Sequence, residues 1–398
     1  MNDLTPPIRF PEFEGDWKTS EISQRMTVFR GASPRPKGDQ RYYGGNIPRL
    51  MIQDVTRDGK ITYPCIDFLT QEGAAKSRLL KKGSLVLSCS GTKVAIPGIL
   101  GIDACIHDGW LSFKDYNDVD INFLFLQFEK LHERIQGSAT KGGVFNNLTT
   151  DIVKSMKIGF PSIEEQGKTA SFLSVVDEKI HLLKERYTLL RQYKKGVMQK
   201  LFSQEIRFKD CNGQAFPDWN FRQGNELFLS VSDKKHNSDL PILAITQEHG
   251  AIPRDLINYQ VQATDSSVAS YKVVNKGDFI ISLRSFQGGI EYSQYKGICS
   301  PAYIILRPCS EIVDDFYRYY LKTGNFIQEM KRRLEGIRDG KILSYKYFSE
   351  IKLPYPCVAE QQKIADFLQE LDKKLAAVQQ QIELTQTFKK GLLQQMFV

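Results

Sequence analysis

The chain has 398 residues, and 54 basic against 46 acidic side chains give it a formal net charge of +8. The length corresponds to two to three domains of about 150 residues, and 41% hydrophobic with 25% charged residues excludes a mostly disordered chain. No run of residues approaches the roughly 18 apolar positions of a membrane helix, and the amino terminus does not resemble a signal peptide. The seven scattered cysteines form no Cys-x-x-Cys pair, so we expect a cytoplasmic protein without disulfides or zinc.

Residues 1–158 are predicted to form a mixed domain of several short strands and a few helices. A buried strand follows the turn at Lys82-Gly83-Ser84, and residues 124–135 favour a helix. Basic residues gather in Gly-rich loops, where Arg can pair with phosphate or guanine and Tyr can contact sugar or base, although a merely solvated loop is the alternative. The candidate DNA-binding residues of this domain are Arg35, Tyr42, Ser90, Thr92, Lys93, Thr140 and Lys141.

Residues 159–203 are predicted to form a long helix. Apolar side chains recur at alternating spacings of three and four after Pro161, which is the a and d pattern of a coiled coil. A helix of about 40 residues spans about 60 Å, and alone it would leave this stripe in water. The predicted seam residues are Leu173, Val176, Ile180, Leu183 and Leu190.

The second half of the chain has the same organisation. Residues 204–355 contain a strand-like run after Lys276-Gly277-Asp278 and a predicted helix over 316–334, and residues 356–398 form a second long helix. The seam residues of that helix are Leu368, Leu371, Leu375, Val378 and Ile382. The candidate DNA-binding residues of the second domain, again in Gly-rich loops, are Arg284, Ser285, Gln287, Arg338 and Lys341.

An internal repeat carries the strongest signal. When residues 156–202 are laid over residues 351–397 without a gap, 16 of the 47 positions are identical, including the seam lysines Lys194 and Lys389. The period is about half the chain, so the repeat is a duplication and not a solenoid. We expect an α+β chain whose two mixed α/β domains are separated by two long antiparallel helices that form an intramolecular coiled coil. The alternative is two unrelated amphipathic helices, each packed on its own domain.

Sequence motifs of catalysis are missing. No Gly-x-Gly-x-x-Gly, His-Glu-x-x-His or Gly-x-Ser-x-Gly occurs, and the nearest phosphate-loop match, Gly336 to Ile342, lacks the Ser or Thr that binds magnesium. The Asn/Asp-Pro-Pro-aromatic signature expected of amino-group methyltransferases is also absent from the sequence. We therefore predict a binding protein with no catalytic residue and no metal site.

The two long helices resemble those of the DNA-specificity subunits of type I restriction–modification systems. Each helix opens with Pro-x-x-x-Glu-Gln, at Pro161 and Pro356, and closes with Lys-Lys-Gly and a following Phe, at Phe202 and Phe397. The segment Phe-Pro-Glu-Phe-x-Gly-x-Trp at residues 10–17 is also typical of that family. The first copy departs from the pattern only at Gly167, where the second copy has Gln362.

The resemblance implies a non-catalytic subunit that reads a bipartite DNA site with two target-recognition domains, while the helices fix the spacing between the half-sites. It also implies a set of partners: double-stranded DNA, two modification (methyltransferase) subunits that bind S-adenosylmethionine, and restriction (translocase–nuclease) subunits. This chain would bind no cofactor itself. Two alternatives stay open, namely a fused or stand-alone restriction enzyme or methyltransferase, and a coiled-coil scaffold without a role in DNA binding.

Overall fold

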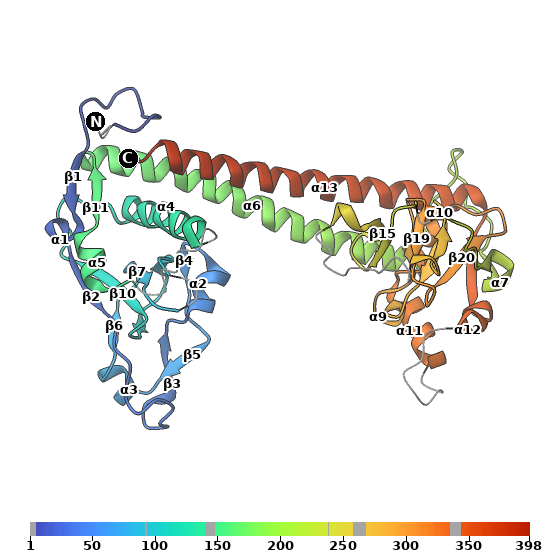
Figure 1. The fold of residues 1–398 in the computed structure, drawn as a ribbon, viewed down its shortest axis with the longest axis horizontal. Coiled ribbons are helices and arrows are strands. Elements are labelled where there is room, and N and C mark those ends of the chain that lie inside the picture. The colour runs from blue at the N-terminus through green and yellow to red at the C-terminus, as the bar shows by residue number, and fades with distance from the viewer. Residues whose placement is uncertain (1–4, 92–93, 140–147, 238, 258–267, 335–343) are drawn as a thin grey trace. The chain divides into compact units, whose positions relative to one another are not determined.

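The computed structural model describes residues 5–91, 94–139, 148–237, 239–257, 268–334 and 344–398 (Figure 1). The chain divides into two compact units, each of which contains one mixed domain and a part of both long helices. Unit 1 comprises Met1–Lys184 and Gln380–Val398, and unit 2 comprises Glu185–Gln379. The boundary between the units thus falls within each long helix, whereas the segments expected from sequence, 159–203 and 356–398, keep each helix whole. No helix in the described ranges is long and apolar enough to cross a membrane.

The two long helices are α6, Ile163–Phe202, and α13, Val358–Gln395. In unit 1 the first part of α6 packs against the last part of α13, and in unit 2 the remaining parts pack together (Figure 1). The ion pairs between them join Asp177 to Lys389 and Lys194 to Asp372, so partner numbers fall along α13 as they rise along α6. The helices are therefore antiparallel, as the repeat predicted.

Most of the predicted seam is buried where the mixed domains pack on the helices. Leu173, Val176 and Ile180 join the core cluster of the first domain, and Leu368 and Leu371 join that of the second. Val378 and Ile382 are buried as well, whereas Leu183, Leu190 and Leu375 are half-buried. Seven of the ten predicted seam residues are thus buried. Both helix pairing and domain packing contribute to this burial, which is favourable in proportion to the apolar area removed from water.

The first domain has two sheets, with the strand orders β2-β10-β7-β8-β4 and β5-β3-β9-β6, and an antiparallel pair of β1 with β11. Helix α4 covers the predicted helix and buries Phe123, Leu124 and Phe128 in the core. The strands are β1 Lys18–Glu21, β2 Thr27–Arg30, β3 Tyr43–Arg49, β4 Ile61–Thr62, β5 Asp67–Leu69, β6 Arg78–Leu80, β7 Leu85–Ser88, β8 Pro97–Leu100, β9 Ala104–Ile106, β10 Trp110–Lys114 and β11 Lys157–Phe160. The helices are α1 Ile22–Arg25, α2 Ile52–Asp58, α3 Gln71–Ala75, α4 Ile121–Ala139 and α5 Thr150–Ser155.

The second domain has one four-stranded sheet of order β13-β20-β17-β18 and the two-stranded pairs β12-β21, β14-β15 and β16-β19. Its core is rich in aromatic side chains, among them Phe228, Phe279, Phe316 and Phe348. The strands are β12 Asn220–Gln223, β13 Phe228–Val231, β14 Leu243–Thr246, β15 Gly250–Pro253, β16 Lys272–Val274, β17 Phe279–Ile281, β18 Glu291–Tyr292, β19 Gly297–Cys299, β20 Ile304–Pro308 and β21 Lys352–Tyr355. The helices are α7 Gly224–Leu227, the 3-10 helix Arg254–Leu256, α9 Ser285–Gly288, α10 Asp314–Tyr320, α11 Gly324–Leu334 and α12 Tyr345–Ser349.

Each domain contains a sheet with the same strand order. The strand order β2-β10-β7-β8 in the first corresponds to β13-β20-β17-β18 in the second. The third strand of each follows a glycine with positive φ, Gly83 at 87° and Gly277 at 96°, a conformation that costs other residues energy. The duplication read from the helices therefore extends into the domains, where few residues are identical.

The helix predicted over 316–334 is two helices in the structure, α10 and α11. The Thr323 hydroxyl accepts the Phe326 N–H at 3.4 Å, which satisfies one free donor at the start of α11. A threonine in the middle of an apolar pattern is compatible in sequence with one continuous helix or with two helices. In the structure the chain breaks at Thr323, and Phe326 packs in the core.

The glutamate that opens each long helix is buried and ties the helix to its domain. Glu165 accepts hydrogen bonds from two nitrogens of Arg9, both at 2.7 Å, and from the indole of Trp17 at 3.2 Å. Glu360 repeats these contacts at 3.1, 2.9 and 2.9 Å with the equivalent side chains, Arg207 and Trp219. The hydrogen bond to Glu165 also raises the pKa of Arg9 above its usual range, so the guanidinium keeps its charge.

The glutamine of the same motif joins the helix start to the helix that follows the sheet. The side-chain oxygen of Gln166 accepts the Asp120 N–H, just before α4, at 3.0 Å. Gln361 accepts the Val313 N–H, just before α10, at 2.9 Å. Each amide also donates to the carbonyl of the motif's own proline. Helices α4 and α10 therefore occupy equivalent positions in the two units.

We expect Glu165→Ala to lower the free energy of unfolding by about 3 kcal/mol, because it leaves a largely buried arginine and an indole N–H without their acceptor. Urea unfolding followed by circular dichroism measures the loss. The matched control is Glu164→Ala, which removes an exposed carboxylate from the same helical turn and should cost about 0.5 kcal/mol. Equal losses in the two variants would contradict the assigned role of Glu165.

Candidate nucleic-acid interface

In the first domain, the chain that follows β2 lies directly against the turn between β9 and β10. Gly31 donates to the Trp110 carbonyl at 2.9 Å, and Ala32 donates to the Ile106 carbonyl at 3.1 Å. A Cβ on Gly31 would stand 2.3 Å from the His107 carbonyl oxygen, so only glycine allows this approach. The approach brings residues 33–35 next to residues 107–109.

Asp108 is the centre of a polar cluster at this place, made of Arg30, Ser33, Arg35, Ser90 and Asp108. The Ser33 hydroxyl donates to Asp108 at 2.6 Å, Arg30 donates to its carbonyl at 2.5 Å, and Arg35 lies 3.4 Å from its carboxylate. The Ser33 hydrogen bond outweighs burial and holds the pKa of Asp108 below its usual value. Ser90 completes the cluster, because its hydroxyl stands 3.1 Å from where a Cβ on Gly109 would lie.

The cluster brings together two of the predicted residues, Arg35 and Ser90, and both are exposed. The side chain of Arg35 is 65% accessible, and an ion pair at such exposure contributes little stability. Its guanidinium therefore remains available to a phosphate or a guanine edge. Sequence reasoning missed Ser33 and Asp108, although the Asp-Gly pair at 108–109 is a turn signal that marks the position.

Tyr42 is placed differently from the prediction. Only 3% of it is accessible, its hydroxyl accepts a hydrogen bond from the Lys76 ammonium at 2.7 Å, and that ammonium lies 4.4 Å from the ring centroid. The backbone of Tyr42 also packs against Gly73, where a Cβ would approach its carbonyl oxygen to 2.1 Å. The ring is part of the domain interior and does not present a face to DNA.

In the second domain, the loop after β17 forms the short helix α9. Arg284 and Gln287 are exposed on it, as predicted for contact residues. Ser285 is 1% accessible, and its hydroxyl accepts the Ser282 N–H at 2.8 Å. Ser285 therefore shapes the loop from inside and does not face a ligand. Gly289, at a φ of 86°, closes the loop against the Leu321 carbonyl, which a Cβ would approach to 2.2 Å.

The turn between β14 and β15 supports α9, which the sequence did not indicate. The Gln247 amide donates to the Arg284 carbonyl at 3.5 Å, and its side chain lies 2.5 Å from where a Cβ on Gly288 would stand. Gly288 of the predicted Gly-rich loop thus makes room for Gln247. Residues 247 and 284 are far apart in sequence, and no local signal connects them.

The remaining predicted residues lie outside the described part of the chain. They are Thr92, Lys93, Thr140, Lys141, Arg338 and Lys341.

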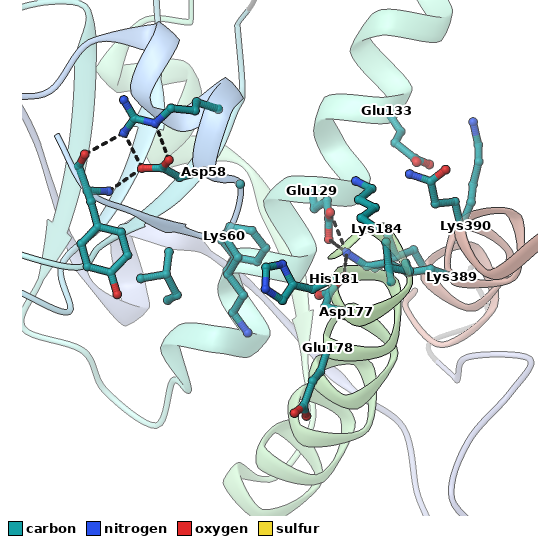
Figure 2. Close-up of a pocket in the computed structure, with 18 residues that line it drawn as sticks. Asp58, Lys60, Glu129, Glu133, Asp177, Glu178, His181, Lys184, Lys389 and Lys390 are labelled. Carbon is teal, nitrogen blue, oxygen red and sulfur yellow. Dashed lines mark hydrogen bonds and ion pairs between the residues drawn. The ribbon is translucent and has the colours of Figure 1, made fainter. Parts of the chain in front are cut away.

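Each unit has a cleft between its mixed domain and the two long helices. The cleft of unit 1 has a volume of about 910 Å³ and is lined by α4, the residues after α2, and both helices (Figure 2). The cleft of unit 2 has a volume of about 660 Å³ and is lined by α10, the β14–β15 turn and the same two helices. Helix positions 195 residues apart line both, for example Lys194 with Lys389 and Lys195 with Lys390. Among described residues, no three His, Cys, Asp or Glu side chains are grouped to hold a metal ion.

Residues 14–192 and 219–386 both match the family model described as the type I restriction modification DNA specificity domain. Putative type I restriction enzyme MjaX specificity subunit of Methanocaldococcus jannaschii is 24% identical over 417 residues, which cover 96% of this chain and 93% of that protein. Putative type I specificity subunit S.MgeORF438P of Mycoplasma genitalium is 26% identical over 302 residues, which cover 72% of this chain and 73% of that protein.

Solved structures share the fold. The S subunit of a type I restriction–modification system from M. genitalium superposes with a TM-score of 0.54 at 17% identity, and the match covers 99% of both chains. A chain from a study of complex assembly and conformational transition of the type I R-M system superposes with a TM-score of 0.59 at 16% identity, over 97% of this chain and 98% of that one. The two matched regions carry the two copies of the internal repeat, and the chain belongs to the family of type I restriction–modification DNA-specificity subunits.

Proposed function

We propose that the chain reads each half of a bipartite DNA site with exposed residues of the loop after the third strand of the equivalent sheet in each domain, joined in the first domain by Arg35 from the segment after β2. The observation that carries this proposal is the equivalence of those loops. The loop after β17 exposes Arg284, and the loop after β7 exposes Ser90. Arg35, which is also exposed, lies in the neighbouring segment that follows β2. Arginine is the commonest side chain in specific contacts to guanine. The two loops share no sequence, as expected of domains that read different half-sites.

We further propose that the chain catalyses no reaction itself and works in the cytoplasm with partners. Two modification subunits, each with its own S-adenosylmethionine, would methylate the site, and restriction subunits would join them for cleavage. The duplication supports two copies of one partner, because a protein with two equivalent surfaces offers the same site twice.

The surface that fits the modification subunits is an apolar ridge on the long helices. Leu189 and Tyr193 on α6 are 57% and 53% accessible, and their repeat equivalents on α13, Leu384 and Phe388, are 62% and 56% accessible. Such side chains on the outer face of a helix pair are unusual unless another surface covers them. The two pairs are 195 residues apart, so the same partner surface fits both.

Arg35→Gln and Arg284→Gln are each expected to weaken cognate-site binding by about tenfold, because each removes one bidentate contact. The complex with the modification subunits is used, and fluorescence anisotropy over a salt series gives the affinity. When the half-site read by the first domain is scrambled, Arg35→Gln should cause no further loss of affinity. When the half-site read by the second domain is scrambled, Arg284→Gln should cause none. Methylation sequencing supplies the half-sites.

The matched control for these variants is Arg222→Gln. Arg222 stacks on Tyr355, 3.9 Å from the ring centroid, on the β12-β21 pair, which is part of neither loop. It should bind with unchanged affinity. If the two test variants bind as the wild type at every salt concentration, the loops do not contact DNA.

The purified chain alone is expected to transfer no methyl group from S-adenosylmethionine to duplex DNA, whereas the complex with modification subunits should do so. Incorporation of a tritiated methyl group measures both. Methyl transfer by the isolated chain that is lost when residues of this chain are mutated would instead support a fused methyltransferase.

Leu384→Ser with Phe388→Ser should remove one modification subunit and leave the other, because the equivalent Leu189 and Tyr193 remain. Native mass spectrometry would then show one modification subunit per chain in place of two. The control is Gln381→Ser, an exposed polar position of α13, which should keep both. Retention of two subunits by the double variant would exclude this ridge as the docking surface.

A further inference from the structure

The lysine that closes the repeat motif is buried in a cluster of three helices in unit 1. Lys389 on α13 is 8% accessible, and its ammonium lies 2.7 Å from the Asp177 carboxylate on α6 and 2.7 Å from both carboxylate oxygens of Glu129 on α4. Figure 2 shows Lys389 reaching from α13 between these two acids. Burial opposes the charge of Lys389, but the two carboxylates outweigh it and raise its pKa above the usual value. The cluster therefore joins the recognition domain to both long helices through a full charge.

Unit 2 contains the equivalent cluster with the helices exchanged. Lys194, now on α6, pairs with Asp372 on α13. The third member is Tyr319 of α10, whose hydroxyl donates to Asp372 at 2.6 Å and whose ring centroid lies 4.9 Å from the Lys194 ammonium. Burial, followed by the hydrogen bond to Asp372, raises the pKa of Tyr319, which keeps the hydroxyl protonated as a donor.

The repeat relates the two clusters. The lysines are 195 residues apart, and so are the aspartates. Helices α4 and α10, which carry Glu129 and Tyr319, occupy equivalent positions in their units. The helix–helix ion pair is thus identical in both units, and only the domain contributes a different residue.

A second contact between domain and helix recurs at equivalent positions. In unit 1 the Lys60 ammonium donates to the Ser174 hydroxyl of α6 at 2.9 Å. In unit 2 the Gln369 amide of α13, at the position equivalent to Ser174, donates to Asp315 of α10 at 2.6 Å. Each domain is therefore held on its helix pair at two successive turns, about 5 Å apart along the axis.

The apolar seam alone does not fix this arrangement. A slip of α13 along α6 by one turn would exchange one apolar seam residue, Leu, Ile or Val, for another at most positions. The same slip would set Lys389 opposite Leu173 or His181 and Lys194 opposite Leu368 or Ala376, none of which is acidic. A buried lysine without a carboxylate is strongly unfavourable, and buried polar residues are known to specify the register of coiled coils.

We propose that these two joint clusters, Asp177–Lys389–Glu129 and Lys194–Asp372–Tyr319, fix the register of the helix pair and the position of each recognition domain on it, and so determine which half-site separation the assembled complex accepts. The proposal rests on the proposed function, since it concerns how the two reading domains are held. The residues are positioning residues that touch no DNA.

The test uses Glu129→Gln and Tyr319→Phe, which keep the side-chain shapes and remove the charge or the hydroxyl. Complexes with the modification subunits are assayed for initial methylation rate on duplexes whose half-sites have the native separation, or one base pair more or less. We expect the preference of the wild type for the native separation to fall about fivefold in each variant, as loss of one charge-assisted hydrogen bond allows. Lys373→Gln, which breaks an exposed ion pair with Glu370 on the same helix, should leave the preference unchanged.

A charge exchange provides the rescue. Lys194→Asp should lose the preference for the native separation, and Lys194→Asp combined with Asp372→Lys should restore it, because the exchange rebuilds the ion pair in the same register. Restoration of thermal stability without restoration of the preference would overturn the proposal.

The outcomes separate this inference from the proposed function. A wild-type complex that methylates all separations equally would overturn both. A wild-type complex with a clear preference that Glu129→Gln and Tyr319→Phe leave intact would overturn the joint clusters alone, whatever those variants do to the melting temperature.

Discussion

Two helices of 40 and 38 residues each carry an apolar stripe that neither can bury alone. Duplication supplies the partner within the same chain, and an antiparallel pairing lets the intervening domain return the chain to the start of the second helix. Every other feature follows this constraint. The domains pack on the helix starts, where the seam is most buried, and each compact unit takes one part of both helices.

Apolar burial supplies most of the driving force, but polar residues decide the geometry. Glu165 and Glu360 are almost fully buried, and each is satisfied by an arginine and an indole. Burying such charges costs desolvation energy and adds little net stability, so their repeated presence is better explained by the single arrangement that satisfies them. The lysines within the seam follow the same logic, because a hydrophobic residue at that position would allow neighbouring registers.

The two domains show how a shared frame holds different reading surfaces. The strand order and the positive-φ glycines before β7 and β17 are common to both. The loops that follow are held differently: the loop after β7 begins with Cys89 donating to the Gly109 carbonyl at 2.8 Å, and the loop after β17 is held by Ser285 and Gln247. Variation confined to loops changes what is read without disturbing the core or the helix pair.

The sequence by itself determined the duplication, the two long helices, their seam and the family, because each rests on periodicity or motifs within about fifty contiguous residues. Exposure of the candidate residues was decided only by the tertiary structure. Tyr42 and Ser285 lie in the same kind of Gly-rich segment as Arg35 and Arg284. In the structure both are buried, and their hydroxyls accept hydrogen bonds from Lys76 and from the Ser282 N–H. Asp108 and Gln247 hold the candidate interface residues Arg35 and Arg284 from 73 and 37 residues away, and contacts at such separations leave no local pattern to read.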